Sequence, residues 1–377
     1  MKYYLKILLQ HYAMGLIVSI TIIWKLQNGL SLSTAVFTES IVLLATALSD
    51  LPAGFIANAI NNKRSLIIGA ALHLLAVTLL AIGRSLPVFV ASALAMGVAW
   101  AFISGADEAY IHDDFIADKS DYKKVFATVN AVDEAATILG MLTASLCMYV
   151  KFGLRDLFVA AAVVLAVHLL YSIFFLPSSV KTVDTHTSST KLFNATLLKN
   201  KAVLTIMPAM LAFGVLYEAG RALWQPHMQQ IGINVADFGL IFAGLKLASI
   251  GGSVVARHKD FHISHLLVVF AVMLASLLIF GSSAKVVSIA GLCVYLFMEN
   301  YFRIFMSTTM NRLIHRNRAA VLSFGSVIKN ASGALIVGGA SVLVRFSIFY
   351  ALLMIVLVKL PAIYYLVRRQ AEPNTIA

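Results

Sequence analysis

Charge is what this sequence has least of. Only 12% of its 377 residues are Asp, Glu, Lys or Arg, whereas 60% are apolar. Soluble domains carry about a quarter charged residues, so the composition excludes an ordinary soluble protein. The apolar runs are long and continuous and do not alternate with a period of two, which indicates membrane-spanning helices and not barrel strands.

Several chemical signatures are also lacking. No glycine-rich loop ends in Lys followed by Ser or Thr, so direct use of ATP is unsupported. No hydrophilic domain is present to carry a catalytic triad or a carboxylate pair, and we predict neither an enzyme nor a cofactor. The two cysteines, Cys147 and Cys293, fall in apolar segments, where packing is their expected role. No metal site is expected, because the cluster His258, His262 and His265 also fits a polar helix end.

What the chain has in abundance is apolar segments long enough to cross about 30 Å of hydrocarbon. There are twelve, near residues 5–26, 33–58, 65–84, 87–112, 122–149, 153–176, 201–226, 234–257, 262–281, 285–308, 318–343 and 346–368. Lys2 and Lys6 precede the first segment as in a signal peptide, but the segment is too long and lacks a cleavage site. We therefore expect it to be retained as a helix.

The basic residues are distributed unevenly over the connections. Eighteen of the 29 Lys and Arg residues lie at the termini or in even-numbered connections, and six lie in odd-numbered connections. Cytoplasmic loops are enriched in Lys and Arg, so both termini are predicted to be cytoplasmic in a plasma (inner) membrane. Topology thus accounts for the net charge of +12, and no nucleic-acid partner is needed.

The longest polar break, residues 177–200, is rich in Ser and Thr and separates six segments from six. It predicts an N-terminal bundle over residues 1–176, a cytoplasmic linker over 177–200 and a C-terminal bundle over 201–377. Two six-helix repeats with a binding site between them are typical of secondary transporters. The expected fold is an all-α membrane protein with twelve transmembrane helices in two pseudo-symmetric bundles, as a monomer in the lipid bilayer.

Four motifs occur in a fixed order along these segments. The first runs from Asp50-Leu51-Pro52-Ala53-Gly54 to Lys63-Arg64, between the second and third segments. The others are "SGADEAYIHDD" at 104–114, "WQPHMQQIGI" at 224–233 and "NRLIHRNRAAVLSFGS" at 311–326.

Together these motifs resemble the major facilitator superfamily, in an efflux-like prokaryotic branch with Ser-Gly-Ala-Asp-Glu-Ala in helix 4. The resemblance implies a gate at Asp50, Gly54, Asn58, Lys63 and Arg64. The family's loop aspartate, arginine and glycine are replaced here by Asn58, Ala59 and Asn61, so Asp50 is a candidate for the missing charge. The helix-4 arginine and the helix-5 proline motif of drug/proton antiporters are also absent.

Asp107 and Glu108 follow one of the longest apolar runs in the chain. At 1.5 Å per residue they lie about 30 Å along helix 4, near its cytoplasmic end. Three roles remain open for this pair: pairing with loop bases such as Lys63, Arg64 or Lys124, gating or coupling, and direct contact with substrate.

Other ionisable residues fall well inside the segments, where a charge is costly unless it is paired or hydrated. Asp133 and Glu134 lie near the middle of helix 5 and are either proton-titrating groups or members of permanent salt bridges. The C-terminal half contributes Glu218, Arg221, Lys246, Glu299, Arg303 and Lys329. Glu299 and Arg303, four residues apart, are expected to form an ion pair on one helix. Opposite charges on the two halves are expected to pair in one state and separate in the other.

Histidine and tryptophan provide further candidates. His11 shares a stripe with Tyr12 and is expected to face a cavity, whereas His73 and His168 are expected to be packed and hydrogen-bonded. Trp24, Trp100 and Trp224 either stack on a substrate or, for Trp24 and Trp224, anchor the helix ends at the membrane surface.

These observations predict a secondary transporter that moves a small organic solute by alternating access, with proton-coupled export favoured over other modes. Two alternatives remain open. One is a nutrient or siderophore importer of the same fold, and the other is a non-transporting membrane receptor or scaffold.

Overall fold

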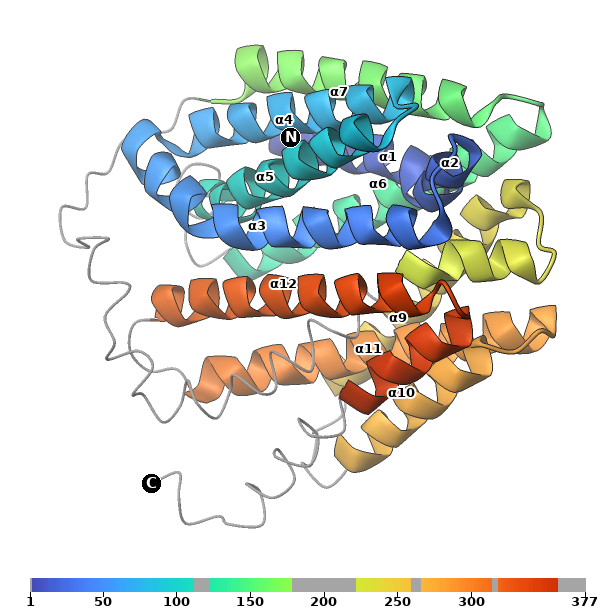
Figure 1. The fold of residues 1–377 in the computed structure, drawn as a ribbon. Coiled ribbons are helices and arrows are strands. Elements are labelled where there is room, and N and C mark those ends of the chain that lie inside the picture. Colours follow the sequence, from blue (N-terminus) through green and yellow to red (C-terminus); the bar gives the residue numbers. More distant parts are fainter. Residues whose placement is uncertain (1, 112–121, 178–221, 259–265, 314–317, 359–377) are drawn as a thin grey trace. The chain divides into compact units, whose positions relative to one another are not determined.

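The computed structural model describes residues 2–111, 122–177, 222–258, 266–313 and 318–358, and every regular element in these ranges is helical (Figure 1). Within them, 8 helices are long and apolar enough to cross a membrane, or 9 if a bent pair counts as one span. The predicted all-α membrane fold is confirmed.

The observed helices follow the predicted segments closely. They are α1 (Lys2–Val18), α2 (Thr21–Gln27), α3 (Leu32–Ile60), α4 (Asn62–Ile82), α5 (Leu86–Tyr110), α6 (Tyr122–Tyr149), α7 (Leu154–Phe175), the short η4 (Val235–Asp237), α9 (Phe238–His258), α10 (Leu266–Phe280), α11 (Lys285–Leu313) and α12 (Arg318–Leu343). Residues 222–230 and Ile348–Val358 are also helical.

The first predicted span is the one that differs in form. The structure breaks it into α1 and α2, which are bent by 47° relative to each other. At the break, Thr21 Oγ1 donates to the Ile17 carbonyl at 2.8 Å. Beyond it, Trp24 is 8% exposed and its Nε1 donates to the Leu80 carbonyl of α4 at 2.7 Å. The expectation that Trp24 anchors the helix at the membrane surface is therefore wrong, because its indole is packed inside the protein.

The chain divides into two compact units. The first comprises Met1–Ser31, Ile41–Ser189 and Asn234–Ala243, and the second comprises Leu32–Ser40, Thr190–Ile233 and Gly244–Ala377. Helices α3 and α9 each contribute residues to both units.

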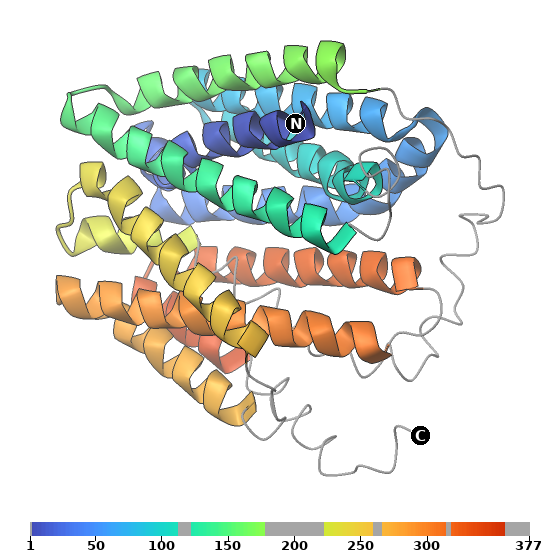
Figure 2. The same cartoon turned by 180° about the vertical axis from the view of Figure 1, so that it is seen from behind.

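In the first unit, α1 packs against α6 and α7, and α4 packs against α5 and α7. Figure 2 shows α1 and α6 running alongside each other. Small residues permit the close approaches that helices need in lipid. At Gly97 of α5, for example, a Cβ would lie 2.4 Å from the Val42 carbonyl of α3.

The short loop between α3 and α4 requires an unusual backbone conformation. Asn61 has a φ of 96°, a value that favours glycine, and it occupies the position of the glycine in the family motif. Its side chain compensates in part, because Asn61 Oδ1 accepts a hydrogen bond from the Arg64 amide at 2.9 Å and so caps α4.

In the second unit, α10 packs against α11. Asn300 of α11 is buried and joins α11 to α9, since its Nδ2 donates to the Ser249 carbonyl at 2.7 Å and to Ser253 Oγ at 2.6 Å. Close packing accompanies this contact, because a Cβ at Gly252 would lie 2.1 Å from the Phe297 carbonyl.

Candidate functional site

A histidine and a carboxylate meet near the middle of two helices in the first unit. His11 Nδ1 of α1 lies 2.5 Å from Asp133 Oδ1 of α6, and their side chains are 17% and 34% exposed. Thr137, one turn further along α6, donates from Oγ1 to the same carboxylate oxygen at 3.3 Å. The two groups are within hydrogen-bonding distance, and their exposed fractions leave the pair partly accessible.

The pair exists because α1 and α6 approach each other closely. A Cβ at Gly15 would lie 2.4 Å from the Thr137 carbonyl, and a Cβ at Gly140 would lie 2.3 Å from the Tyr12 carbonyl. Gly15 follows His11 by one turn, so the glycine contact determines the distance between His11 and Asp133. The sequence placed His11 and Asp133 on candidate stripes, but it gave no reason to pair them.

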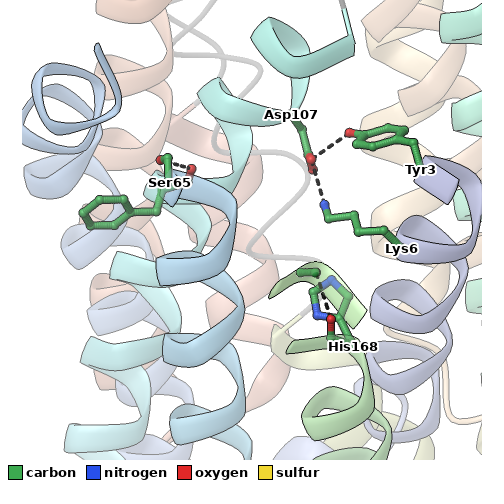
Figure 3. A network of polar contacts seen from close by, with 7 residues as sticks. Tyr3, Lys6, Ser65, Asp107 and His168 are labelled. Atoms are coloured by element: carbon green, nitrogen blue, oxygen red, sulfur yellow. Dashed lines mark hydrogen bonds and ion pairs between the residues drawn. The ribbon is translucent and has the colours of Figure 1, made fainter. Parts of the chain in front are cut away.

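A second ion pair joins α1 to α5 (Figure 3). Lys6 Nζ lies 2.7 Å from Asp107 Oδ1, and Tyr3 donates from its hydroxyl to the same oxygen at 2.7 Å. Lys6 is 1% exposed, and the Tyr3 ring stacks on Tyr110 with centroids 5.3 Å apart. Buried charges are usually paired, and here the lysine and carboxylate neutralise each other.

This contact corrects the expected partners of Asp107. The partner in the structure is Lys6 of α1 and not a base in the loops. Lys6 was treated in the sequence as a flanking residue, and the signal that would have identified it is its stripe with Tyr3 and Gln10, a polar set at helical spacing inside an apolar segment.

The remaining gate candidates lie along α3, α4 and α5. Asp50 is half-buried on α3, and a Cβ at Gly54 would meet open space. Lys63 and Arg64 begin α4, where Lys63 is half-buried and Arg64 is exposed. Asn58 lies on α3 and Glu108 on α5, and the placement of their side chains is outside the described part of the structure.

The candidates of the second unit occupy three helices. Lys246 of α9 and Lys329 of α12 are half-buried, and Glu299 of α11 is 2% exposed. Arg303 is exposed, and its Nε donates to Asn300 Oδ1 at 2.7 Å, so this nitrogen is not held by the Glu299 carboxylate as the spacing suggested. Glu218 and Arg221 lie outside the described residues, as do His262, His265 and nearly all of the 177–200 linker.

Among the residues that the structure describes, no three His, Cys, Asp or Glu side chains come together to hold a metal ion. His73 and His168 are fully buried, as expected of packed residues. Neither ring has a hydrogen-bond partner among the protein groups that the structure describes, so the expected hydrogen bonds to protein are not observed there.

Comparison with known proteins identifies the family. The model of the Major Facilitator Superfamily matches residues 7–338. The chain belongs to this superfamily. No curated protein matches the sequence of this superfamily member. Its fold is similar to that of a nucleoside transporter, NupG, at 14% identity and a TM-score of 0.78, with 97% of this chain and 98% of that chain covered.

Other solved members show the same likeness in fold. A D-xylose–proton symporter is 13% identical with a TM-score of 0.74, and the match covers 97% of this chain and 96% of that one. A POT family transporter solved with 5-aminolevulinic acid is 13% identical with a TM-score of 0.75, and covers 100% and 96% of the two chains. At these identities the likeness establishes the twelve-helix superfamily fold and not a substrate.

Proposed function

We propose that this superfamily member is a proton-coupled secondary transporter that exports a small organic solute by alternating access. The single observation that carries proton coupling is the His11–Asp133 pair. Ionisable residues inside a membrane span are costly and mark ion or proton pathways. A partly exposed histidine–carboxylate pair meets both demands on a coupling site, because it keeps the charge paired and remains accessible to a proton.

The coupling cycle follows from the chemistry of this pair. Protonation of Asp133 removes its negative charge and weakens its hold on His11, which loosens α1 from α6. Loss of the proton restores the charged contact. A proton thereby changes the relative free energies of two arrangements of these helices, which is the requirement for a ligand to shift a conformational equilibrium. Glu134, the adjacent acid, is the second candidate for the titrating group.

The proposed direction and location rest on the sequence. Export is supported by the motif "SGADEA" and its resemblance to an efflux-like branch, and a plasma (inner) membrane with both termini cytoplasmic is supported by the positions of Lys and Arg. Asp50, Gly54, Lys63 and Arg64 are proposed gate residues. The protein is proposed to act as a monomer in the bilayer.

The test uses purified protein in liposomes loaded with the pH-sensitive dye pyranine. Sugars, nucleosides, short peptides and cationic dyes are added in turn, with a proton gradient imposed in either direction. We expect one class of solute to move in exchange for protons, in the opposite direction, and Asp133→Asn to lose gradient-driven transport while keeping solute exchange. Asp156→Asn, which neutralises the acid that caps α7, is the matched control.

Three results would contradict the proposal. Full proton coupling in both Asp133→Asn and Glu134→Gln would show that neither acid is the proton-titrating group. Solute accumulation driven only by an inward-directed proton gradient would favour the importer, whereas no movement of any solute would favour the receptor or scaffold.

A further inference from the structure

The first unit contains three fully buried side chains whose polar atoms are all unsatisfied within the described structure. Gln10 of α1, His73 of α4 and His168 of α7 are each 0% exposed. Neither the amide oxygen nor the amide nitrogen of Gln10 has a hydrogen-bond partner in the described part of the chain, and the same is true of both nitrogens of each histidine ring. Buried polar side chains nearly always have a partner in protein or ordered water, so three such residues together require an explanation.

The three residues belong to helices that pack on one another. Helix α7 contacts both α1 and α4. Figure 3 shows His168 directly below the Lys6–Asp107 pair. The six unsatisfied atoms therefore lie in the interior where α7 packs on α1 and α4, and the three residues are called the buried cluster.

An alternative assignment of the side-chain atoms does not satisfy the cluster. Amide and imidazole orientations are commonly exchanged by turning the group over. Here both polar atoms of each group lack a partner, so turning over Gln10, His73 or His168 exchanges one unsatisfied atom for another. A separate small molecule would supply the partner that these groups lack.

The chemistry of the cluster indicates which molecule this is. A glutamine amide and a neutral imidazole each present one acceptor and at least one donor, so the partner must both donate and accept. An ion is not required, because Asp107 already neutralises Lys6. Buried water typically makes about three hydrogen bonds to otherwise unsatisfied polar groups.

We propose that Gln10, His73 and His168 form a binding site for internal water, which joins α1 to α4 and α7 inside the first unit. The ionisable groups on the neighbouring helices include Lys6 and His11 of α1, Asp107 of α5, Asp133 and Glu134 of α6, and the two histidines themselves. The water would add to the direct polar contacts of helix α1, which include Lys6 to α5 and His11 to α6, a further link from Gln10 to α4 and α7. This inference does not depend on the proposed transport activity.

The first test looks for the water directly, by X-ray radiolytic footprinting of the protein in lipid nanodiscs. Hydroxyl radicals generated from bound water modify the side chains next to it even where bulk solvent is excluded. We expect His73 and His168 to be modified, whereas Phe89, which is also 0% exposed, provides the dry reference. Gln10→Leu is expected to reduce modification of both histidines several-fold. Modification of the histidines no faster than that of Phe89 would overturn the proposal.

The second test uses the sign of a stability change. If the site is dry, Gln10→Leu removes an unsatisfied polar group and raises the melting temperature. If the site holds water, the same change removes a partner of that water, and the melting temperature falls by about 2–4 °C. Met14→Leu, an apolar exchange on the same helix, is the control and is expected to leave the melting temperature within about 1 °C. A rise in Gln10→Leu would also overturn the proposal.

Discussion

Asp133 Oδ1 and His11 Nδ1, which are 122 residues apart in the sequence, lie 2.5 Å apart in the structure. The two helices that carry them approach most closely at Gly15 and Gly140, one to two turns away on α1 and α6. The chemistry of the candidate coupling site therefore depends on residues that have no side chain at all.

Replacing His11 is expected to change the pH dependence of transport. His11→Gln removes the ring that contacts Asp133 Oδ1 in the described structure, so the pH–rate profile of this variant is expected to differ from that of the wild type. The profile is measured as initial transport rate against pH in proteoliposomes. Tyr12→Phe, which removes the neighbouring hydroxyl bond to Thr143, is the control, and equal profiles for all three proteins would exclude His11 from the coupling site.

Widening the contact between α1 and α6 is expected to weaken proton coupling, because it moves His11 away from Asp133. In Gly15→Ala the new Cβ would lie 2.4 Å from the Thr137 carbonyl, so the helices must separate. We expect a loss of about 1–3 kcal/mol of stability together with weaker proton coupling. Gly244→Ala is the matched control, because a Cβ there meets nothing within 4 Å. The prediction fails if the two variants have the same melting temperature and the same coupling.

Breaking the Lys6–Asp107 pair on one side is expected to destabilise the first unit. Removing one member of a buried pair commonly costs about 3–5 kcal/mol. Asp107 is 18% exposed and keeps its Tyr3 bond, so we expect about 2 kcal/mol for Lys6→Met. Thermal unfolding in detergent measures the effect. The double variant Lys6→Met/Asp107→Leu is expected to recover part of the loss, because it leaves no charge unpaired, and a double variant less stable than Lys6→Met would argue against the pairing.

Two substitutions at Asn61 distinguish the energetic effect of backbone strain from that of helix capping. Asn61→Ala keeps a φ that disfavours side chains and loses the cap on α4, so we expect it to lower stability by about 1 kcal/mol. Asn61→Gly also loses the cap but removes the strain, and its melting temperature is expected to lie at or above that of the wild type. If glycine proved as damaging as alanine, the strain at Asn61 would have no measurable energetic effect.

The sequence predicted the helices well and their polar contacts poorly. Segment 122–149 coincides with α6 and segment 318–343 with α12. In lipid only a helix satisfies the backbone hydrogen bonds of a single segment, so a long apolar segment predicts a helix directly. The break at residues 19–20 was not foreseen, since α1 and α2 are apolar on both sides of it. Hydrophobicity predicts that a segment lies in lipid, but it does not predict a bend such as the one between α1 and α2.

The same limit applies to the partners of charged residues. The sequence identified Asp107 and Asp133 as costly charges inside apolar segments, and both are indeed paired. It assigned the first to loop bases and left the second between proton exchange and a permanent salt bridge. The pairing with Lys6 and His11 depends on how α1 is rotated and how closely it packs, which no local pattern specifies.

By itself, then, the sequence determined an all-α membrane protein, because peptide groups and charges are costly in lipid and long apolar segments result; its four motifs added the resemblance to the major facilitator superfamily. Only the tertiary structure decided that α1 carries both ion pairs and that Gln10, His73 and His168 are buried without a partner among the described protein groups. The physical reason is that an ion pair or a hydrated site is formed by side chains from different helices, whose distances depend on packing through residues such as Gly15 and Gly140.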